Sequence, residues 1–496
     1  MDARGSSKSL LEHFNNRFRF RHLGLGFLWA WIYCTWLSPA LFDGATGLTT
    51  NNDISWTISV AFVTISLFVS PFLFKRNLID IRWIRIAAPV ANCLGAFAMA
   101  QHVIFGTNIP YVSVLGAAVT GIASGWLWIM WGEFFGSVDL EITHFTLPLT
   151  VAIPLCCMLL TLGAAGPFAG AGICILPLAS GACLLLSLND KEPLQPVVEK
   201  KDPPPGLWTN FLQLGIASLA TYVAISFCWS SIHYNPEVDW TGWLIVAYIA
   251  GGILAMAIAY LSLTFSVRKN VFSLYRWLVP VVLFAFAALS FQTFASRVIA
   301  FFLITIVQYG FDIIVWVYFT SIIRTGACSG RVAAGINRGF VQLAVLLGSL
   351  LGLASPAWEE AGLISFASIA FIVLGCMVAA IFIVFVNPTR DQLSPLDTFD
   401  VATETELGTT PSVDGPPQKH DETDYDPVLI TCNELTEQHS LTRREKEVLV
   451  LLARGRSIPY ISDALFISKN TVESHVKAIY RKLDVHTRQE LLTIFE

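Results

Sequence analysis

Residues 188–206, LNDKEPLQPVVEKKDPPPG, interrupt a chain of 496 residues that is otherwise rich in long apolar stretches. Five prolines and seven charged residues exclude this segment from the hydrocarbon of a bilayer. On each side of it lie six stretches of about 20 residues, the length that crosses roughly 30 Å of hydrocarbon as a helix. The segment therefore predicts an all-α membrane bundle of six plus six helices.

The expected spans cover most of the chain. With 54% hydrophobic and only 14% charged residues, the sequence excludes a single soluble globule, which carries about 25% charged residues. In chain order we expect spans at 23–43, 54–74, 85–105, 110–131, 143–163, 167–188, 209–229, 241–264, 276–295, 298–320, 335–355 and 362–387.

Lys and Arg residues indicate how the spans are oriented. Eighteen of them fall in the N-terminal head, the even-numbered loops and the central linker, and the odd-numbered loops hold only Arg297. The positive-inside rule then places the head, the linker and the C-terminal tail in the cytoplasm. The first span lacks a small-residue cleavage site, so we expect an anchor in a bacterial inner membrane and not a cleaved signal.

Formal charge divides the chain into parts. Residues 1–389 carry a net charge of +2, residues 390–440 carry −10 and residues 441–496 carry +3. This pattern predicts an acidic connector followed by a small basic domain that binds a polyanion. The expected organisation is a basic head (1–22), a first half (23–188), a cytoplasmic linker (189–208), a second half (209–387), a flexible tether (388–437) and a DNA-binding domain (438–496).

Twelve helices in two halves with cytoplasmic linker and termini resemble the major facilitator superfamily, over about residues 20–389. The resemblance lies in topology. That family's basic, glycine-containing signature between the second and third helices falls on residues 74–82, FKRNLIDIR, where the charges remain and the glycines are missing. The resemblance implies a transporter-like fold, and the altered signature favours a role other than transport.

Asp312 is the only carboxylate well inside an expected span, in VQYGFDIIVWVYF. Because ionisable groups are costly in lipid, we regard it, with Gln308 and Tyr309, as a candidate site for a cationic or hydroxyl-bearing ligand or a proton. The alternative is a structural pair or a protonated acid. Helix-to-helix hydrogen bonds explain the weaker candidates at least as well; these are Asn92, Gln101, His102, His144 and Gln342.

Two further patterns indicate packing. Trp126, Trp128 and Trp131 lie near the cytoplasmic end of the fourth span, where interfacial tryptophan is common, so a belt or packing role is favoured over stacking on a flat ligand. Glycines four residues apart at 121–125 and 348–352 predict close helix approach.

The last 56 residues predict a compact helical domain. Thr442 to Glu445 form a capping box that begins a first helix, whose buried stripe comprises Val448, Leu449, Leu451 and Leu452. Gly455 is placed to end it, Ser457 to cap a short second helix, and Ser468 to cap a third. Residues 487–495 predict a short fourth helix.

The expected third helix has an apolar face and a polar, basic face. Val472, Val476, Ile479, Tyr480 and Leu483 share one side at helical spacing. A short helix, a tight turn and a longer helix with a polar outer face are typical of a helix-turn-helix, whose longer helix enters the major groove of DNA.

These residues resemble the LuxR-type helix-turn-helix family over most of the segment. The matching positions are Leu441-Thr442-x-Arg444-Glu445-x-x-Val448-Leu449, Ala453-x-Gly455, Ile461, Leu465, Ile467-Ser468, Thr471-Val472-x-x-His475, Ile479, Lys482-Leu483 and Arg488. The resemblance implies binding to double-stranded promoter DNA as a homodimer. By the family pattern, base edges are read by Glu473, Ser474 and Lys477, and the remaining expected DNA-facing residues are Lys469, Asn470, Thr471, His475, Arg481 and Lys482.

The sequence thus predicts a membrane-bound bacterial transcription regulator controlled by a small-molecule signal that the bundle senses. One alternative is a secondary transporter with a DNA-binding tail, and another is a membrane scaffold whose tail binds protein. No phosphate-binding loop or catalytic pair of carboxylates is recognisable, so we expect no enzyme activity and no cofactor. The cysteines lack metal-ligand spacing, and no metal site is expected.

Overall fold

Every regular element in the described part of the computed structural model is a helix, as the sequence predicts. Contacts between residues divide the chain into two compact units, Met1–Gly408 and Thr409–Glu496. The residues described are 19–37, 49–107, 109–162, 166–189, 207–233, 241–265, 272–291, 293–324, 326–385, 431–432, 435–436, 438–439, 441–453, 461, 469–483, 485, 490–491 and 494.

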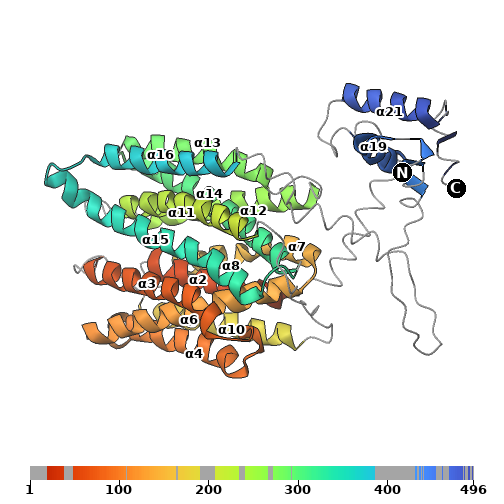
Figure 1. Ribbon diagram of the computed structural model, residues 1–496. Helices are drawn as coiled ribbons and strands as arrows, with labels where there is room; N and C mark the ends of the chain where they lie inside the picture. Colours follow the sequence, from red (N-terminus) through yellow and green to blue (C-terminus); the bar gives the residue numbers. More distant parts are fainter. Residues whose placement is uncertain are drawn as a thin grey trace, which may run out of the picture. The chain divides into compact units, whose positions relative to one another are not determined.

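The first half of the membrane unit begins with a short 3-10 helix and continues with long apolar helices (Figure 1). The elements are η1 (Phe20–Gly24), α2 (Leu25–Leu37), α3 (Thr49–Leu73), η3 (Leu78–Asp80), α4 (Arg82–Met99), α5 (Gln101–Phe105), α6 (Pro110–Ser137), α7 (Leu140–Thr150), α8 (Ala152–Leu162), α9 (Pro167–Cys174) and α10 (Leu176–Leu188).

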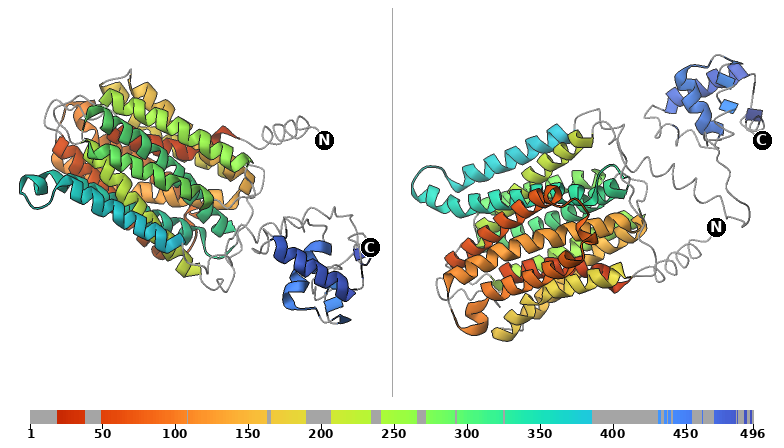
Figure 2. Two further views of the ribbon diagram at one scale, coloured as in Figure 1. Left: turned by 90° about the horizontal axis from the view of Figure 1, so that it is seen from above. Right: turned by 60° about the horizontal axis from the view of Figure 1, so that its bottom comes forward.

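The second half consists of longer helices. They are α11 (Leu207–His233), α12 (Thr241–Phe265), α13 (Phe272–Ser290), α14 (Phe294–Arg324), α15 (Gly330–Glu360) and α16 (Phe366–Phe385). Figure 2 shows the helices of the membrane unit packed side by side along a common direction. Their arrangement is that of a helical membrane bundle.

Each expected span overlaps one helix or two consecutive helices. The spans at 85–105, 143–163 and 167–188 are divided between two helices. Pro154 in the first turn of α8 and Pro177 in the first turn of α10 account for two of the breaks. By length and hydropathy, the described residues contain eight helices able to cross a membrane and two shorter apolar ones. The total of twelve crossings stays a prediction.

The outer surface of the membrane unit carries large apolar side chains. Phe72, Leu160 and Phe168 are 75%, 74% and 92% exposed. Large aromatic and aliphatic side chains exposed on apolar helices indicate a lipid-facing surface. The chain is a multi-pass membrane protein.

Small residues allow the closest helix contacts, as the glycine spacing predicts. A Cβ atom on Gly121 of α6 would overlap the Ser59 carbonyl oxygen of α3. One on Gly348 of α15 would lie 2.5 Å from the Val223 carbonyl oxygen of α11. These two contacts join α6 to α3 and α15 to α11, and any larger side chain would push the backbones apart.

The second unit contains α19 (Arg443–Ala453) and α21 (Lys469–Leu483). The predicted capping box is present at the start of α19: the Glu445 amide donates to the Thr442 hydroxyl at 3.3 Å, and the Thr442 amide donates to the Glu445 carboxylate at 2.7 Å. Most residues of the predicted second and fourth helices, and the expected caps Ser457 and Ser468, lie outside the described residues.

An apolar core joins α19 and α21. Val448, Leu449 and Leu452 from α19 meet the buried face of α21, and Ile461 and Leu491 complete the cluster. Cys432 is also fully buried in this core, although the sequence analysis assigns it to the flexible tether. The folded core thus includes a residue of the predicted tether, and the expected domain boundary stays a prediction.

Candidate ligand cavity and nucleic-acid interface

A buried ion pair joins two helices of the second half. Arg338 of α15 donates through Nη1 to Oδ1 of Asp312 of α14 at 2.6 Å, and both side chains are 3% exposed. Of the two alternatives that the sequence left open for Asp312, a structural pair and a ligand contact, the first is present. The ligand role stays a prediction.

The Arg338 guanidinium also faces aromatic rings. Its Cζ atom lies 4.3 Å from the ring centre of Trp128 of α6 and 5.8 Å from that of Trp316 of α14. The cation is therefore held between a carboxylate of its own half and an indole of the other half. Arg338 connects the two halves of the bundle.

Sequence reasoning missed Arg338 as part of the site. The expected eleventh span, 335–355, contained this arginine, but the sequence analysis did not name it among the polar residues of the spans. The structure begins α15 at Gly330, so Arg338 lies about two turns inside the helix. The extra polar turns at the start of α15 lower the local hydropathy, so an apolar-run criterion does not detect them.

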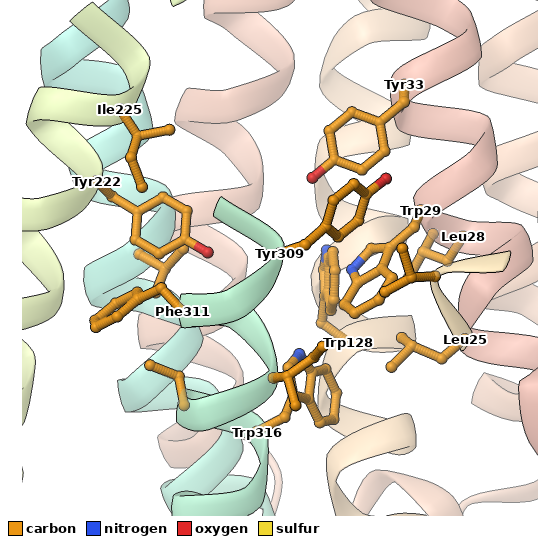
Figure 3. Packing of buried hydrophobic residues seen from close by; sticks show 14 of the residues in the cluster. Leu25, Leu28, Trp29, Tyr33, Trp128, Tyr222, Ile225, Tyr309, Phe311 and Trp316 are labelled. Carbon is orange, nitrogen blue, oxygen red and sulfur yellow. The ribbon is translucent and has the colours of Figure 1, made fainter. Parts of the chain in front are cut away.

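A cavity of about 160 Å³ lies beside the ion pair and is lined by both halves. Asp312, Gln308 and Arg338 border it, together with Gln342. Its wall also contains six tryptophans: Trp29, Trp31, Trp36, Trp56, Trp128 and Trp229. Figure 3 shows Tyr222 of α11 on one side of α14 and Trp29 of α2 on the other. We call this space the tryptophan-lined cavity.

The structure brings together two of the three predicted ligand residues. Asp312 and Gln308 line the cavity, and the Gln308 amide donates to the Tyr33 hydroxyl. Tyr309 does not line it; its buried hydroxyl instead forms a hydrogen bond with the hydroxyl of Tyr248 of α12. Its predicted ligand role therefore has no support from its position.

Two of the weaker candidates form hydrogen bonds within the bundle, as the sequence analysis favoured. Asn92 of α4 donates to Ser124 of α6 at 2.9 Å, and Gln101 donates to the Ile109 carbonyl oxygen at 2.7 Å. The other three weaker candidates lie in different environments: His102 is exposed, His144 is half-buried, and Gln342 lines the cavity.

The three tryptophans of α6 have separate environments. Trp126 donates to Ser70 at 3.1 Å and Trp131 donates to Ser180 at 3.0 Å, which are packing roles. Trp128 is 1% exposed and lines the cavity, so a position in an interfacial belt is wrong for this residue.

Glu133 occupies a position that the sequence did not predict. It was expected in the fourth loop, but it lies inside α6 and is 4% exposed. Its carboxylate accepts hydrogen bonds from the backbone N–H groups of Leu78 at 3.0 Å and Ile79 at 2.8 Å. These donors belong to η3, in the connection between α3 and α4. The carboxylate therefore fixes the connection between α3 and α4.

In the C-terminal unit, α21 presents a polar face. Five of the predicted DNA-facing side chains are exposed: Thr471, Glu473, Ser474, Lys477 and Arg481. His475 and Lys482 are half-buried, while Lys469 and Asn470 lie in the first turn of α21 and their side chains are outside the description. The opposite face, with Val472, Val476 and Ile479, is in the core. An exposed polar helix face is what major-groove reading requires.

Lys482 has a partner within its own domain. Its Nζ atom donates to the Glu445 carboxylate of α19 at 2.7 Å. Burial opposes ionisation of Glu445, but hydrogen bonds from Lys482 and Thr442 outweigh burial and hold its pKa below the usual 4.5. This ion pair fastens α21 to α19, and the predicted DNA contact of Lys482 competes with it.

Comparisons with known proteins agree with the character of this unit. Residues 439–495 match the family GerE, described as bacterial regulatory proteins of the luxR family. Over 72 residues the chain is 39% identical to the uncharacterised response regulatory protein YgeK of Escherichia coli K12, covering 14% of this chain and 49% of that protein. Over 52 residues it is 48% identical to DegU of Brevibacillus brevis, covering 10% and 22%. The chain thus spans half or less of these relatives, and residues 439–495 form a LuxR-type helix-turn-helix domain.

The membrane unit is similar to solved transporter structures. A bacterial homologue of the iron transporter ferroportin in the outward-facing state matches with a TM-score of 0.55 and 16% identity, covering 74% of this chain and 99% of that one. The same homologue with soaked iron gives a TM-score of 0.51. At this identity the likeness concerns the fold alone. The chain therefore joins a transporter-like membrane fold to a LuxR-type domain, as its sequence predicts.

Proposed function

We propose that this protein is a bacterial transcription regulator held in the inner membrane, with both termini in the cytoplasm. Its C-terminal domain binds promoter DNA as a homodimer, and its membrane unit controls that binding in response to a small molecule. The observation that carries the proposal is the exposed polar face of α21 in a LuxR-type domain that is covalently joined to a membrane bundle. The protein performs no catalytic step in this scheme.

The DNA-binding role is supported by the division of α21 into two faces. Lys477 and Arg481 supply positive charge on the exposed side, and Glu473 and Ser474 supply hydrogen-bonding groups that suit base edges. Phosphate contacts by basic side chains set affinity, while contacts with base edges set sequence preference. The single domain carries a small net charge, so a dimer on two half-sites provides the affinity.

The sensing role is supported by the cavity in the membrane unit. A buried ion pair and six tryptophans surround a space that both halves line. A ligand in this space contacts α2, α3 and α6 of the first half and α11, α14 and α15 of the second. Binding there is able to shift how the halves pack, provided that the ligand prefers one arrangement.

The test uses the full chain in lipid nanodiscs and genomic promoter fragments that the wild-type chain enriches. Lys477→Ala is expected to weaken binding by about tenfold or more and to relax sequence preference, because a base contact contributes roughly 1–3 kcal/mol. Lys446→Ala is the matched control, because it also removes one positive charge but lies on α19 and not on α21. Equal losses for the two variants would contradict the assignment of α21 to the groove.

A transporter with a DNA-binding tail is the second candidate, and the fold of the membrane unit favours it. Uptake of candidate solutes into proteoliposomes distinguishes the two. Flux that disappears in Asp312→Asn would support transport. DNA binding that responds to a solute, without flux, would support a sensor.

A further inference from the structure

The connection between α3 and α4 carries basic side chains that the fold does not use. Lys75, Arg76 and Arg82 are exposed, and none of them forms a hydrogen bond or an ion pair with a described residue. A neighbouring arginine does have a partner, because Arg331 donates through Nε to the Pro71 carbonyl oxygen at 3.1 Å. The three exposed cations are therefore available to a partner outside the bundle.

Packing of two aromatic rings brings these cations to one place. Phe74 directly precedes Lys75. Trp83 directly follows Arg82, in the first turn of α4. The ring centres of Phe74 and Trp83 lie 6.5 Å apart, so their basic neighbours lie on adjoining parts of the surface. Glu133 holds the intervening η3 through two backbone N–H groups, so the arrangement is fixed by the fold. We call the following residues the α3–α4 basic surface: Lys75, Arg76, Arg82 and Trp83.

Formal charge indicates that the partner is an anion. Residues 74–85 contain four basic residues and one acidic residue, Asp80, which gives a net charge of +3. The nearby Glu133 is 4% exposed, and its oxygens accept the η3 N–H groups, so its carboxylate does not reach the surface. Guanidinium and ammonium groups bind phosphate through charge-assisted hydrogen bonds. A phosphate group therefore suits this surface.

The apolar surface next to the cations narrows the partner to a lipid. Trp83 is 56% exposed. The same face of α4 continues with exposed apolar side chains at helical spacing, which are Ile86, Val90 and Leu94. In Figure 1, α4 lies at the edge of the membrane unit. A tryptophan between an apolar helix face and basic residues is typical of the headgroup level of a bilayer. A phosphate bound beside Trp83 would therefore belong to a molecule whose acyl chains lie along α4.

We propose that the α3–α4 basic surface binds an anionic phospholipid. Lys75, Arg76 and Arg82 contact its phosphate, and the Trp83 ring lies against its glycerol backbone. In the proposed topology this connection faces the cytoplasm, where the negative surface of the leaflet attracts basic residues that adjoin a span. The site involves neither the tryptophan-lined cavity nor α21. Lipid binding is measured without DNA, so this proposal and the proposed regulator role fail separately.

Native mass spectrometry of the full chain released from detergent micelles tests the class of lipid with three probes. Phosphatidylglycerol has a net negative charge, phosphatidylcholine with the same acyl chains has none, and glycerol phosphate has the phosphate without acyl chains. The first phosphatidylglycerol is expected to bind at least tenfold more tightly than phosphatidylcholine and to remain bound in a large excess of glycerol phosphate. Equal affinity for the two lipids, or displacement by glycerol phosphate, would overturn the proposal.

Removing two of the cations tests where the lipid binds. Each basic side chain near an anionic lipid contributes about fivefold in affinity, so the double variant Lys75→Gln, Arg82→Gln should weaken phosphatidylglycerol binding about tenfold or more. The double variant Arg268→Gln, Lys269→Gln is the matched control, because it removes one lysine and one arginine from the loop between α12 and α13. Its affinity should stay within about twofold of the wild type.

Three outcomes decide the location. The exchange Lys75→Arg, Arg82→Lys keeps both charges and should keep the wild-type affinity. Equal losses in the Lys75→Gln, Arg82→Gln variant and the matched control, at an unchanged unfolding midpoint, would show a general attraction of basic loops and contradict the site. Replacing the acidic residues of the connector 390–440 by their amides in the full chain should leave lipid affinity unchanged; a tenfold gain would assign the surface to the connector and overturn the proposal.

Discussion

Replacing Asp312 by asparagine should reveal how much the buried ion pair contributes to the membrane unit. In this variant the Arg338 cation keeps its 3% exposure but loses its counter-ion. Removing one partner of a buried pair costs about 3–5 kcal/mol, since the remaining charge is neither paired nor hydrated. The carbonyl oxygen of the introduced amide still accepts one hydrogen bond from Arg338, so we expect a loss near the lower limit, about 3 kcal/mol.

Removing both charges should restore most of the lost stability. The double variant Asp312→Leu, Arg338→Met has no buried charge, and such replacements are often neutral or stabilising. It does lose the contact between Arg338 and Trp128 at 4.3 Å, which contributes about 0.5–2 kcal/mol. We therefore expect a net change within about 2 kcal/mol of the wild type.

Reversible unfolding in mixed micelles, followed by tryptophan fluorescence, measures both variants. Gln342→Leu, which changes an uncharged polar residue of the same cavity, is the control and should cost about 1 kcal/mol or less. The reasoning would be refuted if Asp312→Asn changed the free energy of unfolding by less than about 1 kcal/mol, or if the double variant lost more than Asp312→Asn alone.

Three further predictions concern other parts of the chain. Glu133→Ala should lower the free energy of unfolding of the membrane unit by about 2–4 kcal/mol, because it leaves the Leu78 and Ile79 N–H groups without an acceptor; Glu133→Gln keeps one acceptor oxygen, and an equal loss in both variants would argue against this role. Gly348→Val should destabilise the membrane unit by about 1–3 kcal/mol in the same assay, since a Cβ atom there lies 2.5 Å from a carbonyl oxygen of α11; an unchanged midpoint would show that the contact is looser. The pKa of Glu445 is lower in the folded state than its usual 4.5, so the C-terminal domain should lose stability as the pH falls below about 4.5 and through that lower value; hydrogen exchange of α19 against pH measures this, and Glu445→Gln should flatten the dependence.

Hydropathy and helical periodicity predicted the all-α architecture because both depend on local sequence. A span is recognisable as about 20 consecutive apolar residues, and the capping box at Thr442 and Glu445 involves groups only three residues apart. The burial pattern of α21 also follows directly from its spacing. Local signals of this kind need no knowledge of which helices are neighbours.

The candidate site required contacts that the sequence does not encode locally. Asp312 stood out as a carboxylate in an apolar run, but its partner Arg338 lies 26 residues further along, near the start of α15. The tryptophans of the cavity come from helices that are far apart in the sequence, so their convergence depends on how the halves pack. Glu133 likewise pairs with backbone donors 54 and 55 residues away. Pairings at such separations are set by tertiary packing.

The ion pair of Lys482 shows that contacts distant in sequence are also hidden from sequence analysis within the small domain. The family pattern assigns this lysine to DNA because of its position at the end of α21. The structure adds Glu445, 37 residues earlier, as an internal partner at 2.7 Å. A basic residue on a recognition helix therefore has two available roles, and only the fold reveals the second.

Promoter occupancy in living cells tests the central claim most directly. Cross-linking and immunoprecipitation of the full membrane-bound chain should recover a defined set of promoters, and Lys477→Ala should abolish most of that recovery while Lys446→Ala retains it. Recovery that is the same for the wild type and Lys477→Ala, or the absence of any enriched promoter with the wild-type chain in the membrane fraction, would contradict the account.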